Sequence, residues 1–469
     1  MKLEQMYTGC LAQGAYYIAS EGEAVIIDPL RETAPYIERA KKDGVKIKYI
    51  LETHFHADFV SGHVDLAQKT GATIVYGPMA KPHFEAYIAK DNEILKVGNL
   101  SIKVLHTPGH TMESSCFLLL DEEGREHALY SGDTLFLGDV GRPDLAVKTH
   151  LTEADLAGHL YDSLRQKVMT LPDEVIVYPG HGAGSACGKN MRKETVGTIG
   201  EEKASNYALR ADMTKEEFVK EVTSGLTQAP QYFAKNAMMN QQAIQGIDAV
   251  LDQGLNALPV DEFEMLASQK EILVLDTRAP QEFKNNFIAG AMNIGIDGSF
   301  APWVGALISD LKQPIILIAE IGREKEVVTR LARVGYDNVL GYLEGEMEAW
   351  IETGRATKQI KSIPATEFEK HYANDNITIL DVRKNSEYVA EHVIEAQNFP
   401  LDNLAQAMTT LDKSATYYIH CAGGYRSMIA SSILKANGFN QLIDVAGGFR
   451  AIAATNIPKT AYVCPSTLN

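Results

Sequence analysis

The sequence has few cysteines and no long apolar run. Its five cysteines, in 469 residues, stand at positions 10, 116, 187, 421 and 464. None of them forms a close pair, which argues against a disulfide framework and against a zinc module built from Cys-Cys pairs. The longest apolar runs, such as 116–120, are far shorter than a membrane span, and Glu4 stands where a signal peptide needs an apolar stretch. We therefore expect a soluble, cytoplasmic protein with reduced thiols.

Basic residues are also scarce. Lys and Arg number 44 against 61 Asp and Glu, which gives a net charge of −17. Such a charge repels phosphate backbones and anionic lipids, so we expect neither a nucleic-acid nor a membrane partner. Hydrophobic residues make up 45% and charged residues 22%, the balance of an ordinary globular protein. The length predicts several domains rather than one core.

An internal repeat fills the second half of the chain. The segment Ile-Leu-Val-Leu-Asp-Thr-Arg at 272–278 is echoed by Ile-Thr-Ile-Leu-Asp-Val-Arg at 377–383. The echo continues in register, because Asn293 corresponds to Asn398. Each copy alternates β-branched strands with helical patterns, which is typical of a parallel sheet. We expect two small α/β domains.

The first half has a different character. It combines short predicted strands, such as 23–28 and 46–51, with helices such as 153–168, and it holds ten of the thirteen histidines. The polar helical stretch 240–256 is the predicted boundary, and 358–364 is the predicted joint between the two repeats. The predicted domains are 1–240, 257–357 and 363–465.

Potential metal ligands gather in the first half. The segment Thr-His-Phe-His-Ala-Asp-Phe-Val-Ser-Gly-His covers 53–63, and further candidates follow in Pro-Gly-His at 108–110, Gly-Asp at 132–133 and Pro-Gly-His at 179–181. Each group follows a β-rich run, so the strands can bring distant ligands to one sheet edge. The candidates are His54, His56, Asp58, His63, His110, Asp133 and His181.

This set of motifs resembles the metallo-β-lactamase superfamily. The resemblance covers the first half of the chain and implies an αββα sandwich. Dinuclear zinc hydrolases of the superfamily, such as those resembling glyoxalase II, carry a histidine directly after the motif aspartate, where this chain has Phe59. The motifs His-x-His-Ala-Asp, Pro-Gly-His-Thr and Gly-Arg-x-Asp are similar to those of the persulfide dioxygenases, which hold one Fe(II).

That resemblance implies the site residues. The iron ligands would be His54, His110 and Asp133, a facial triad that leaves positions for a persulfide sulfur and for O₂. Nearby groups that orient the ligands or the substrate would be His56, Asp58 and His181. The groups that meet an anionic thiol such as glutathione persulfide would be Arg142, Tyr178, Lys189 and Arg192.

Zinc remains an alternative. Asp58 and His181 could hold a second ion with Asp133 as the bridge, which would make the protein a zinc-dependent, glyoxalase II-like thioester hydrolase fused to a sulfurtransferase. The role of Cys187, in the segment after His181, stays open.

A second candidate site lies in the last repeat. The strand 417–420 leads into Cys-Ala-Gly-Gly-Tyr-Arg-Ser at 421–427 and then into a helical run. Backbone N–H groups, the positive helix end and Arg426 would favour the thiolate of Cys421. The form Cys-x4-Arg, with Asp381 and the Gly-Gly segment at 447–448 nearby in the pattern, resembles rhodanese sulfurtransferases. The predicted catalytic residues are Cys421, Arg426 and Asp381, and Glu320 at the matching position predicts that the first repeat is inactive.

Together these resemblances imply a bifunctional sulfur enzyme. It would oxidise a low-molecular-weight thiol persulfide with O₂ to sulfite and thiol, and it would exchange sulfur between persulfide, sulfite and thiosulfate through Cys421. A third alternative is a non-enzymatic sulfur carrier or redox sensor in which Cys421 only stores sulfur. The identity of the thiol, the direction of sulfur transfer and the formation of a homo-oligomer stay open.

Overall fold

The computed structural model describes residues 1–145, 151–226, 229–374 and 377–464. The chain divides into two compact units. The first contains residues 1–250 with 331–335, and the second contains the remaining residues. Among the described residues, no helix combines the length and the apolar character needed to cross a membrane.

The first unit contains two six-stranded sheets. The first sheet has the order β1-β2-β3-β4-β5-β6 and the second the order β14-β13-β10-β9-β8-β7. The strands of the first sheet are β1 (Lys2–Thr8), β2 (Gln13–Ser20), β3 (Glu23–Ile27), β4 (Lys46–Glu52), β5 (Thr73–Tyr76) and β6 (Tyr87–Ile88). Those of the second are β7 (Ile94–Val97), β8 (Leu100–His106), β9 (Ser115–Leu120), β10 (Glu126–Gly132), β13 (Ile176–Pro179) and β14 (Gly197–Thr198), and a short ribbon pairs β11 (Leu135–Phe136) with β12 (Asp139–Val140).

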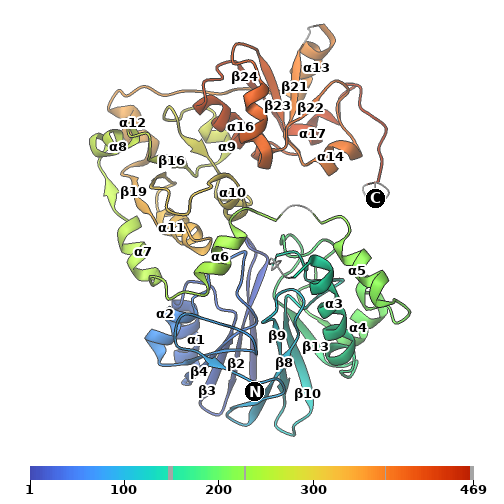
Figure 1. The fold of residues 1–469 in the computed structure, drawn as a ribbon. Coiled ribbons are helices and arrows are strands. Elements are labelled where there is room, and N and C mark those ends of the chain that lie inside the picture. The colour runs from blue at the N-terminus through green and yellow to red at the C-terminus, as the bar shows by residue number, and fades with distance from the viewer. Residues whose placement is uncertain (146–150, 227–228, 375–376, 465–469) are drawn as a thin grey trace. The chain divides into compact units, whose positions relative to one another are not determined.

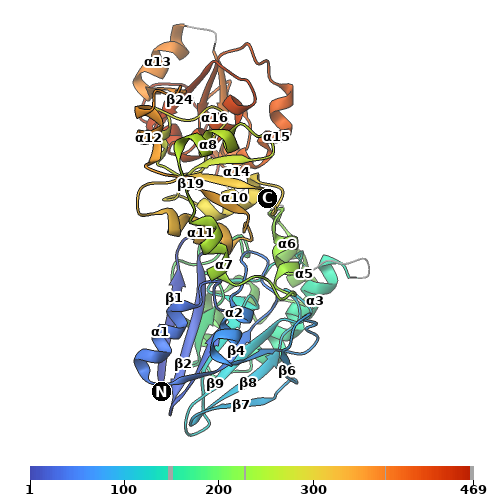
Figure 2. The same ribbon diagram turned by 90° about the vertical axis from the view of Figure 1, so that its left-hand side faces the viewer.

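The two sheets face each other across one core. Val25 and Leu51 of the first sheet pack with Ile102 and Phe117 of the second in a single hydrophobic cluster. The opposite faces are covered by helices, α1 (Ala34–Asp43) and α2 (His63–Thr70) on the first sheet, and α3 (Glu153–Ser163), α4 (Ile199–Ser205) and α5 (Lys215–Thr223) on the second (Figure 1). Figure 2 shows β7, β8 and β9 side by side within the second layer. This is the predicted αββα sandwich.

The predicted helix 153–168 forms in two parts. Thr152 caps α3, because its hydroxyl accepts from the backbone N–H of Asp155 while the Asp155 carboxylate accepts from the N–H of Thr152. After Ser163 the chain continues as a π-helical turn, Leu164–Val168. Leu164 and Val168 are buried in the core beneath the second sheet, so the wider turn still delivers apolar side chains to that core.

The predicted boundary helix 240–256 is shorter in the structure. Helix α6 (Phe233–Met239) ends before it, and α7 covers only Ile247–Gly254. The reason is Asn240, which is buried and whose amide group donates to the backbone carbonyls of His56 and Phe59 and accepts from the N–H of Ser61. A side chain committed to these tertiary contacts ends the helix and fixes the histidine-rich segment.

The second unit contains two five-stranded parallel sheets of the same order. The first has the order β15-β19-β18-β16-β17, with β15 (Ala257–Leu258), β16 (Leu273–Asp276), β17 (Met292–Asn293), β18 (Ile315–Ile318) and β19 (Val339–Leu343). The second has the order β20-β24-β23-β21-β22, with β20 (Lys361–Pro364), β21 (Thr378–Asp381), β22 (Gln397–Asn398), β23 (Tyr417–His420) and β24 (Leu442–Ala446). The shared order confirms the repeat and the small parallel-sheet α/β fold.

Helices connect these strands. In the first repeat they are α8 (Val260–Ala267), α9 (Pro280–Phe283), α10 (Phe300–Leu307), α11 (Glu324–Arg333) and α12 (Glu346–Glu352). In the second they are α13 (Ala365–Asn374), α14 (Asn385–Ala390), α15 (Leu404–Ala407), α16 (Tyr425–Ala436) and α17 (Gly448–Ile452). The domain ranges 1–240, 257–357 and 363–465 stay predictions, and residue 465 lies outside the described residues.

Candidate metal centre and cysteine loop

Three of the predicted ligands meet at one end of the sandwich. His54 follows β4, His110 lies in the loop after β8, and Asp133 follows β10. Their ligand atoms all lie within 4.8 Å of one another, and all three residues are buried. The Nε2 atoms of His54 and His110 lie 3.9 and 3.5 Å from Oδ2 of Asp133. The sandwich therefore converts three distant sequence motifs into one cluster.

Hydrogen bonds orient both imidazoles. Nδ1 of His110 lies 2.9 Å from the carbonyl oxygen of Arg142, and because a carbonyl only accepts, this nitrogen carries the proton. Nδ1 of His54 lies 2.9 Å from Oγ1 of Thr53, whose own proton is donated to Asp28. Each Nε2 therefore presents a lone pair toward Asp133. Burial, together with the neighbouring histidines, lowers the pKa of His54 well below its ordinary value, so its imidazole stays neutral.

The donor set fits a metal cation. Neither carboxylate oxygen of Asp133 has a hydrogen-bond partner among the described residues. An unpartnered buried carboxylate is costly unless a positive charge neutralises it. Two imidazole nitrogens and one carboxylate form a donor set typical of non-haem iron, and zinc also accepts these ligand types.

Glycines of the motifs make room for the cluster. A Cβ atom at Gly141 would lie 1.9 Å from the carbonyl oxygen of Asp133 and 3.1 Å from Nδ1 of His110. A Cβ atom at Gly180 would lie 2.6 Å from Oδ1 of Asp133. The Gly-Arg and Pro-Gly-His motifs therefore keep two backbone segments close to Asp133, one at its backbone carbonyl and one at its carboxylate.

His56 does not face this cluster. Its Nε2 lies 3.1 Å from Oδ1 of Asp28 and 3.3 Å from Oε2 of Glu52, and its ring packs against that of Phe59 at a tilt of 31°, with the ring centres 4.3 Å apart. Burial alone would lower the pKa of His56, but the two carboxylates raise it well above its ordinary value. Sequence reasoning missed Asp28 and Glu52, although both are acids at the ends of buried strands, which is an unusual position that could have identified them.

Asp58 and His181 join a second group with Cys187. The three buried side chains place one ligand atom each within 4.8 Å of the others. Nε2 of His181 lies 3.4 Å from Oδ2 of Asp58 and 3.6 Å from Oδ1 of Asp133, so this group adjoins the first cluster. Burial, with the charges of Asp58 and Asp133, raises the pKa of the Cys187 thiol well above its ordinary value. Cys187, whose role the sequence left open, belongs to this neighbourhood.

The second candidate site is the loop between β23 and α16. Cys421 is buried, and its Sγ accepts a hydrogen bond from the N–H of Gly424 at 3.1 Å. Gly424 has a φ of 104°, a conformation that favours glycine. A Cβ atom at Gly448 would lie 2.4 Å from the carbonyl oxygen of Cys421, which explains a glycine of the Gly-Gly segment. The strand end, the loop and the helix start thus hold the cysteine as predicted from the pattern.

Charged and polar groups surround this loop. Arg426 donates two hydrogen bonds to Glu387 of α14, at 2.6 and 2.8 Å, and this carboxylate raises the pKa of Arg426 although burial opposes the shift. Oγ of Ser427 lies 3.7 Å from Sγ of Cys421 and donates to Oδ1 of Asp444 at 2.7 Å. Sequence reasoning missed Ser427 and Asp444. Asp444 lies in β24, the neighbouring strand of the sheet, and no motif of the sequence connects it with Cys421.

Comparisons with known proteins identify the family. The family model described as metallo-beta-lactamase superfamily matches residues 8–181, and the rhodanese-like domain model matches residues 259–353 and 364–455. The mitochondrial persulfide dioxygenase ETHE1 of Homo sapiens is 31% identical over 201 residues, which cover 42% of this chain and 70% of the relative. The chain belongs to the metallo-beta-lactamase superfamily. Two rhodanese-like domains follow its metallo-beta-lactamase domain.

Other relatives point in more than one functional direction. A probable hydroxyacylglutathione hydrolase of Schizosaccharomyces pombe is 30% identical over 181 residues, 38% of this chain and 66% of the relative. A crystal structure of a metallo-beta-lactamase from Staphylococcus aureus has a TM-score of 0.64 and 32% identity, and the match covers 73% of this chain and 98% of that one. The metallo-beta-lactamase domain therefore has both hydrolase and dioxygenase relatives.

In the rhodanese-like domains, the predicted catalytic residue Asp381 forms a pair that both repeats share. Its carboxylate accepts from Nε of Arg383 at 3.0 Å and from Nη2 at 2.6 Å. Asp276 and Arg278 form the same pair in the first repeat, where Glu320 stands in place of the cysteine. A contact kept in the copy that lacks the cysteine serves the fold of both copies. A catalytic role for Asp381 stays a prediction.

The predicted substrate-binding cations have local partners. Nε and Nη2 of Arg142 donate to Asp144 at 2.7 and 2.6 Å, and Nη1 donates to the carbonyl oxygen of Ala186 at 3.1 Å. Nζ of Lys189 donates to the carbonyl oxygens of Glu221 and Ser224 at 2.6 and 3.0 Å. Arg142 contacts the cluster of His54, His110 and Asp133, because its carbonyl oxygen accepts from Nδ1 of His110.

The other two predicted substrate residues are also engaged. Arg192 pairs with Glu202. The ring of Tyr178 stacks on Tyr130 with the ring centres 5.2 Å apart. Substrate binding by Arg142, Tyr178, Lys189 and Arg192 stays a prediction.

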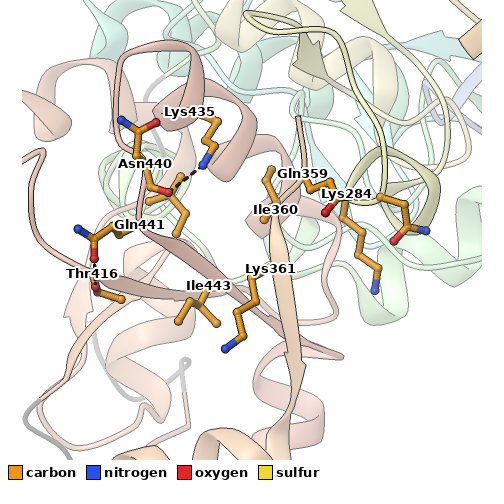
Figure 3. A pocket seen from close by; sticks show the side chains of 11 residues that line it. Lys284, Gln359, Ile360, Lys361, Thr416, Lys435, Asn440, Gln441 and Ile443 are labelled. Atoms are coloured by element: carbon orange, nitrogen blue, oxygen red, sulfur yellow. Dashed lines mark hydrogen bonds between the residues drawn. The ribbon is translucent and has the colours of Figure 1, made fainter. Parts of the chain in front are cut away.

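A cavity of about 600 Å³ lies within the second unit (Figure 3). Its lining includes Lys361 and Leu442, which begin β20 and β24, and Thr416, which precedes β23. Cys421 follows the opposite end of β23. Because the strands are parallel, the cavity lies at the other edge of the sheet and does not belong to the cysteine loop.

Proposed function

We propose that this protein oxidises a low-molecular-weight thiol persulfide with O₂ at one Fe(II) and transfers sulfur through Cys421. The overall oxidation is RSSH + O₂ + H₂O → RSH + H₂SO₃. The observation that carries this proposal is the cluster of His54, His110 and Asp133 beside a His56 that faces two carboxylates and a Phe59 that supplies no ligand. That arrangement favours three protein ligands for a single ion.

His54, His110 and Asp133 would hold the iron. Bound there, Fe(II) supplies the redox chemistry that O₂ and sulfur require, at positions that the protein leaves open. The protein's own groups prepare the site. Nδ1 of His110 donates to the carbonyl oxygen of Arg142, and Nδ1 of His54 donates to Oγ1 of Thr53, so both rings are aligned with Nε2 toward Asp133.

The surroundings of the cluster suit a reaction that must exclude bulk water. His54, His110 and Asp133 are each at most 2% exposed. Asp58, His181 and Cys187 lie next to this cluster, where they can orient the persulfide or a water molecule by hydrogen bonding. The thiol that carries the persulfide, glutathione or a similar compound, is part of the proposal.

Cys421 would carry sulfur between donor and acceptor. Its thiolate attacks the outer sulfur of a persulfide and releases the thiolate RS⁻, which leaves Cys421–S–SH. Sulfite then attacks the outer sulfur, which gives thiosulfate and returns Cys421 to the thiol. The N–H of Gly424 and the start of α16 stabilise negative charge on sulfur, and Arg426 supplies positive charge beside it. The reverse direction, from thiosulfate to persulfide, uses the same groups.

The two reactions share their compounds. Sulfite from the first is the acceptor in the second, and a persulfide is the donor for both. This chemical continuity supports one protein that clears reactive sulfur, and we propose a cytoplasmic location for it. The first rhodanese-like repeat has Glu320 at the position of the cysteine. It would not accept sulfur, because a carboxylate has no thiol that could form a persulfide.

Two substitutions test the division of labour. Cys421→Ser should stop thiosulfate formation while O₂ uptake and sulfite production persist, because the candidate iron ligands His54, His110 and Asp133 are unchanged. Asp133→Ala should stop O₂ uptake and sulfite production, while thiosulfate formation persists when sulfite is supplied. The measurements are O₂ consumption and sulfite production with a persulfide alone, and thiosulfate formation from the same persulfide with added sulfite.

Matched controls are Cys464→Ser and Asp173→Ala, which change exposed residues that belong to neither candidate site. Both control variants should retain both activities. Loss of both activities in folded Cys421→Ser or folded Asp133→Ala protein would refute two independent sites. Loss of both in Cys421→Ser alone would favour the sulfur carrier or sensor.

A zinc-dependent thioester hydrolase is the second candidate. The group of Asp58, His181 and Cys187 beside Asp133 favours it, since these residue types could hold a second ion. Similarity to a hydroxyacylglutathione hydrolase also favours it. This candidate predicts hydrolysis of a glutathione thioester without O₂ uptake.

A further inference from the structure

One face of helix α16 packs against the first rhodanese-like repeat. Tyr425, Met428 and Ser432 lie three and four positions apart, so they share this face. The Tyr425 hydroxyl donates to the carbonyl oxygen of Gly295 at 2.7 Å, and Oγ of Ser432 accepts from the N–H of Asn293 at 3.0 Å. Met428 is buried in the hydrophobic cluster of the first repeat. The helix that follows Cys421 is therefore built partly into the repeat that lacks a cysteine.

The ring of Tyr425 occupies a notch lined by glycine. A Cβ atom at Gly298 would lie 2.3 Å from two atoms of this ring, and one at Gly295 would lie 3.4 Å from it. Neither glycine has a φ in the left-handed region, so the backbone at these positions accepts other residues. The space that Tyr425 needs, rather than the chain path, thus requires glycine at position 298.

The segment 320–330, which follows β18 where the second repeat has its cysteine loop, holds this notch in place. Arg323, three positions after Glu320, donates to both carboxylate oxygens of Asp297 at 2.7 and 2.9 Å. Arg330 of α11 donates to the carbonyl oxygen of Ile296 at 2.7 Å. Asp297 and Ile296 lie between the two notch glycines. The segment that would carry a cysteine in an active repeat here braces the notch.

Tyr425 lies between two groups of the cysteine loop. The preceding residue, Gly424, donates its N–H to Sγ of Cys421, and the following residue, Arg426, pairs with Glu387. A displacement of the Tyr425 backbone would therefore change the positions of both neighbours relative to the sulfur.

We propose that the first rhodanese-like repeat is a positioning domain for the cysteine loop of the second. It seats Tyr425 in the notch of Gly295 and Gly298, and Tyr425 is the positioning residue that sets the N–H of Gly424 and the guanidinium of Arg426 against Cys421. This inference rests on the proposed sulfur transfer at Cys421. It gives the repeat without a cysteine a part in that reaction.

Gly298→Ala tests the inference from the first repeat. The added methyl group must displace the Tyr425 ring, so the turnover number for sulfur transfer from thiosulfate to cyanide should fall by about tenfold to a hundredfold, the scale of a misplacement near 1 Å. Ser299→Ala changes the neighbouring exposed residue and should retain full turnover. Oxygen uptake with persulfide should be unchanged in both variants, which controls for general damage.

A double variant separates positioning from loss of stability. Tyr425→Ala alone should lower turnover, and adding Gly298→Ala should lower it no further, because the methyl group no longer meets a ring. Tyr425→Phe keeps the ring in the notch and should retain more turnover than Tyr425→Ala. Full turnover in Gly298→Ala, or additive losses in the double variant, would overturn the inference.

A second readout keeps the inference distinct from the proposed function. The rate of Cys421 alkylation by iodoacetamide, followed across pH, reports the loop geometry whether or not sulfur is transferred. Absence of sulfur transfer in the unaltered protein would defeat the proposed function at Cys421. An alkylation profile that Gly298→Ala leaves unchanged would defeat the positioning role, and a profile that shifts toward higher pH would support it.

Discussion

Phe59 and His56 lie close to the cluster of His54, His110 and Asp133 but are not part of it. Phe59 is fully buried and its ring packs on that of His56. His56 in turn faces Asp28 and Glu52, two carboxylates that favour its protonated form. Asp28, Glu52 and His56 thus form a buried group of their own, distinct from the cluster of His54, His110 and Asp133.

Phe59→His should change the metal stoichiometry. A histidine at position 59 would add a nitrogen ligand next to Asp58 in the chain, so metal content after equilibration with zinc should rise from one ion per chain toward two. Phe59→Leu keeps the position apolar and should stay at one ion. Metal analysis of the dialysed proteins measures both. An unchanged content in folded Phe59→His would contradict the role given to Phe59.

Ser427 and Ser431 are two buried serines of α16 that differ in their hydrogen bonding. Ser427 donates to the buried carboxylate of Asp444, whereas Oγ of Ser431 is buried with no hydrogen-bond partner among the described residues. Ser427→Ala leaves Asp444 with an unpaired oxygen and should lower the free energy of unfolding by about 1–3 kcal/mol. Ser431→Ala should leave it unchanged or raise it. Equal losses in denaturant unfolding would contradict this hydrogen-bond assignment.

The repeated strand and its Asp-Arg pair build both rhodanese-like domains. In each copy the aspartate ends a central strand and binds an arginine two residues later, and an asparagine donates to the carbonyl oxygens of both residues. The echo at 272–278 and 377–383 predicts the repeat, and the structure adds that both copies have the same strand order. The sequence cannot separate this structural aspartate from a catalytic one, because both would be present in the active copy.

Asp276→Asn and Asp381→Asn should destabilise the protein to a similar extent. Each removes the charge that a buried guanidinium requires, and the expected loss is about 3 kcal/mol in the free energy of unfolding. Urea unfolding of each variant measures it. A much larger effect of Asp381→Asn on sulfur transfer than on stability would instead support the predicted catalytic role of Asp381.

Local patterns predicted the strand ends that carry candidate ligands, and the structure brings His54, His110 and Asp133 together. The contacts that sequence reasoning missed join residues that are distant in the chain. Asn240 ends its helix because it binds the segment after His54, and Cys187 reaches Asp58 only through the fold. Neither contact has a periodicity or spacing that a single sequence displays.

Across the whole chain, a metallo-beta-lactamase domain and a rhodanese-like domain would act on the same sulfur compounds. The proposed oxidation consumes a persulfide and yields sulfite, and the proposed transfer consumes sulfite and yields thiosulfate. The repeat that lacks the cysteine contacts Tyr425 of the cysteine loop, and in our proposal it positions that loop for sulfur transfer. All three domains then contribute to one sequence of reactions.

The most direct test is metal analysis of the full chain purified without oxygen or added metal, followed by O₂ uptake with a panel of low-molecular-weight persulfides. The account predicts one iron per chain, O₂ consumption and sulfite as the product. Two zinc ions per chain, with hydrolysis of a glutathione thioester and no O₂ consumption, would contradict it.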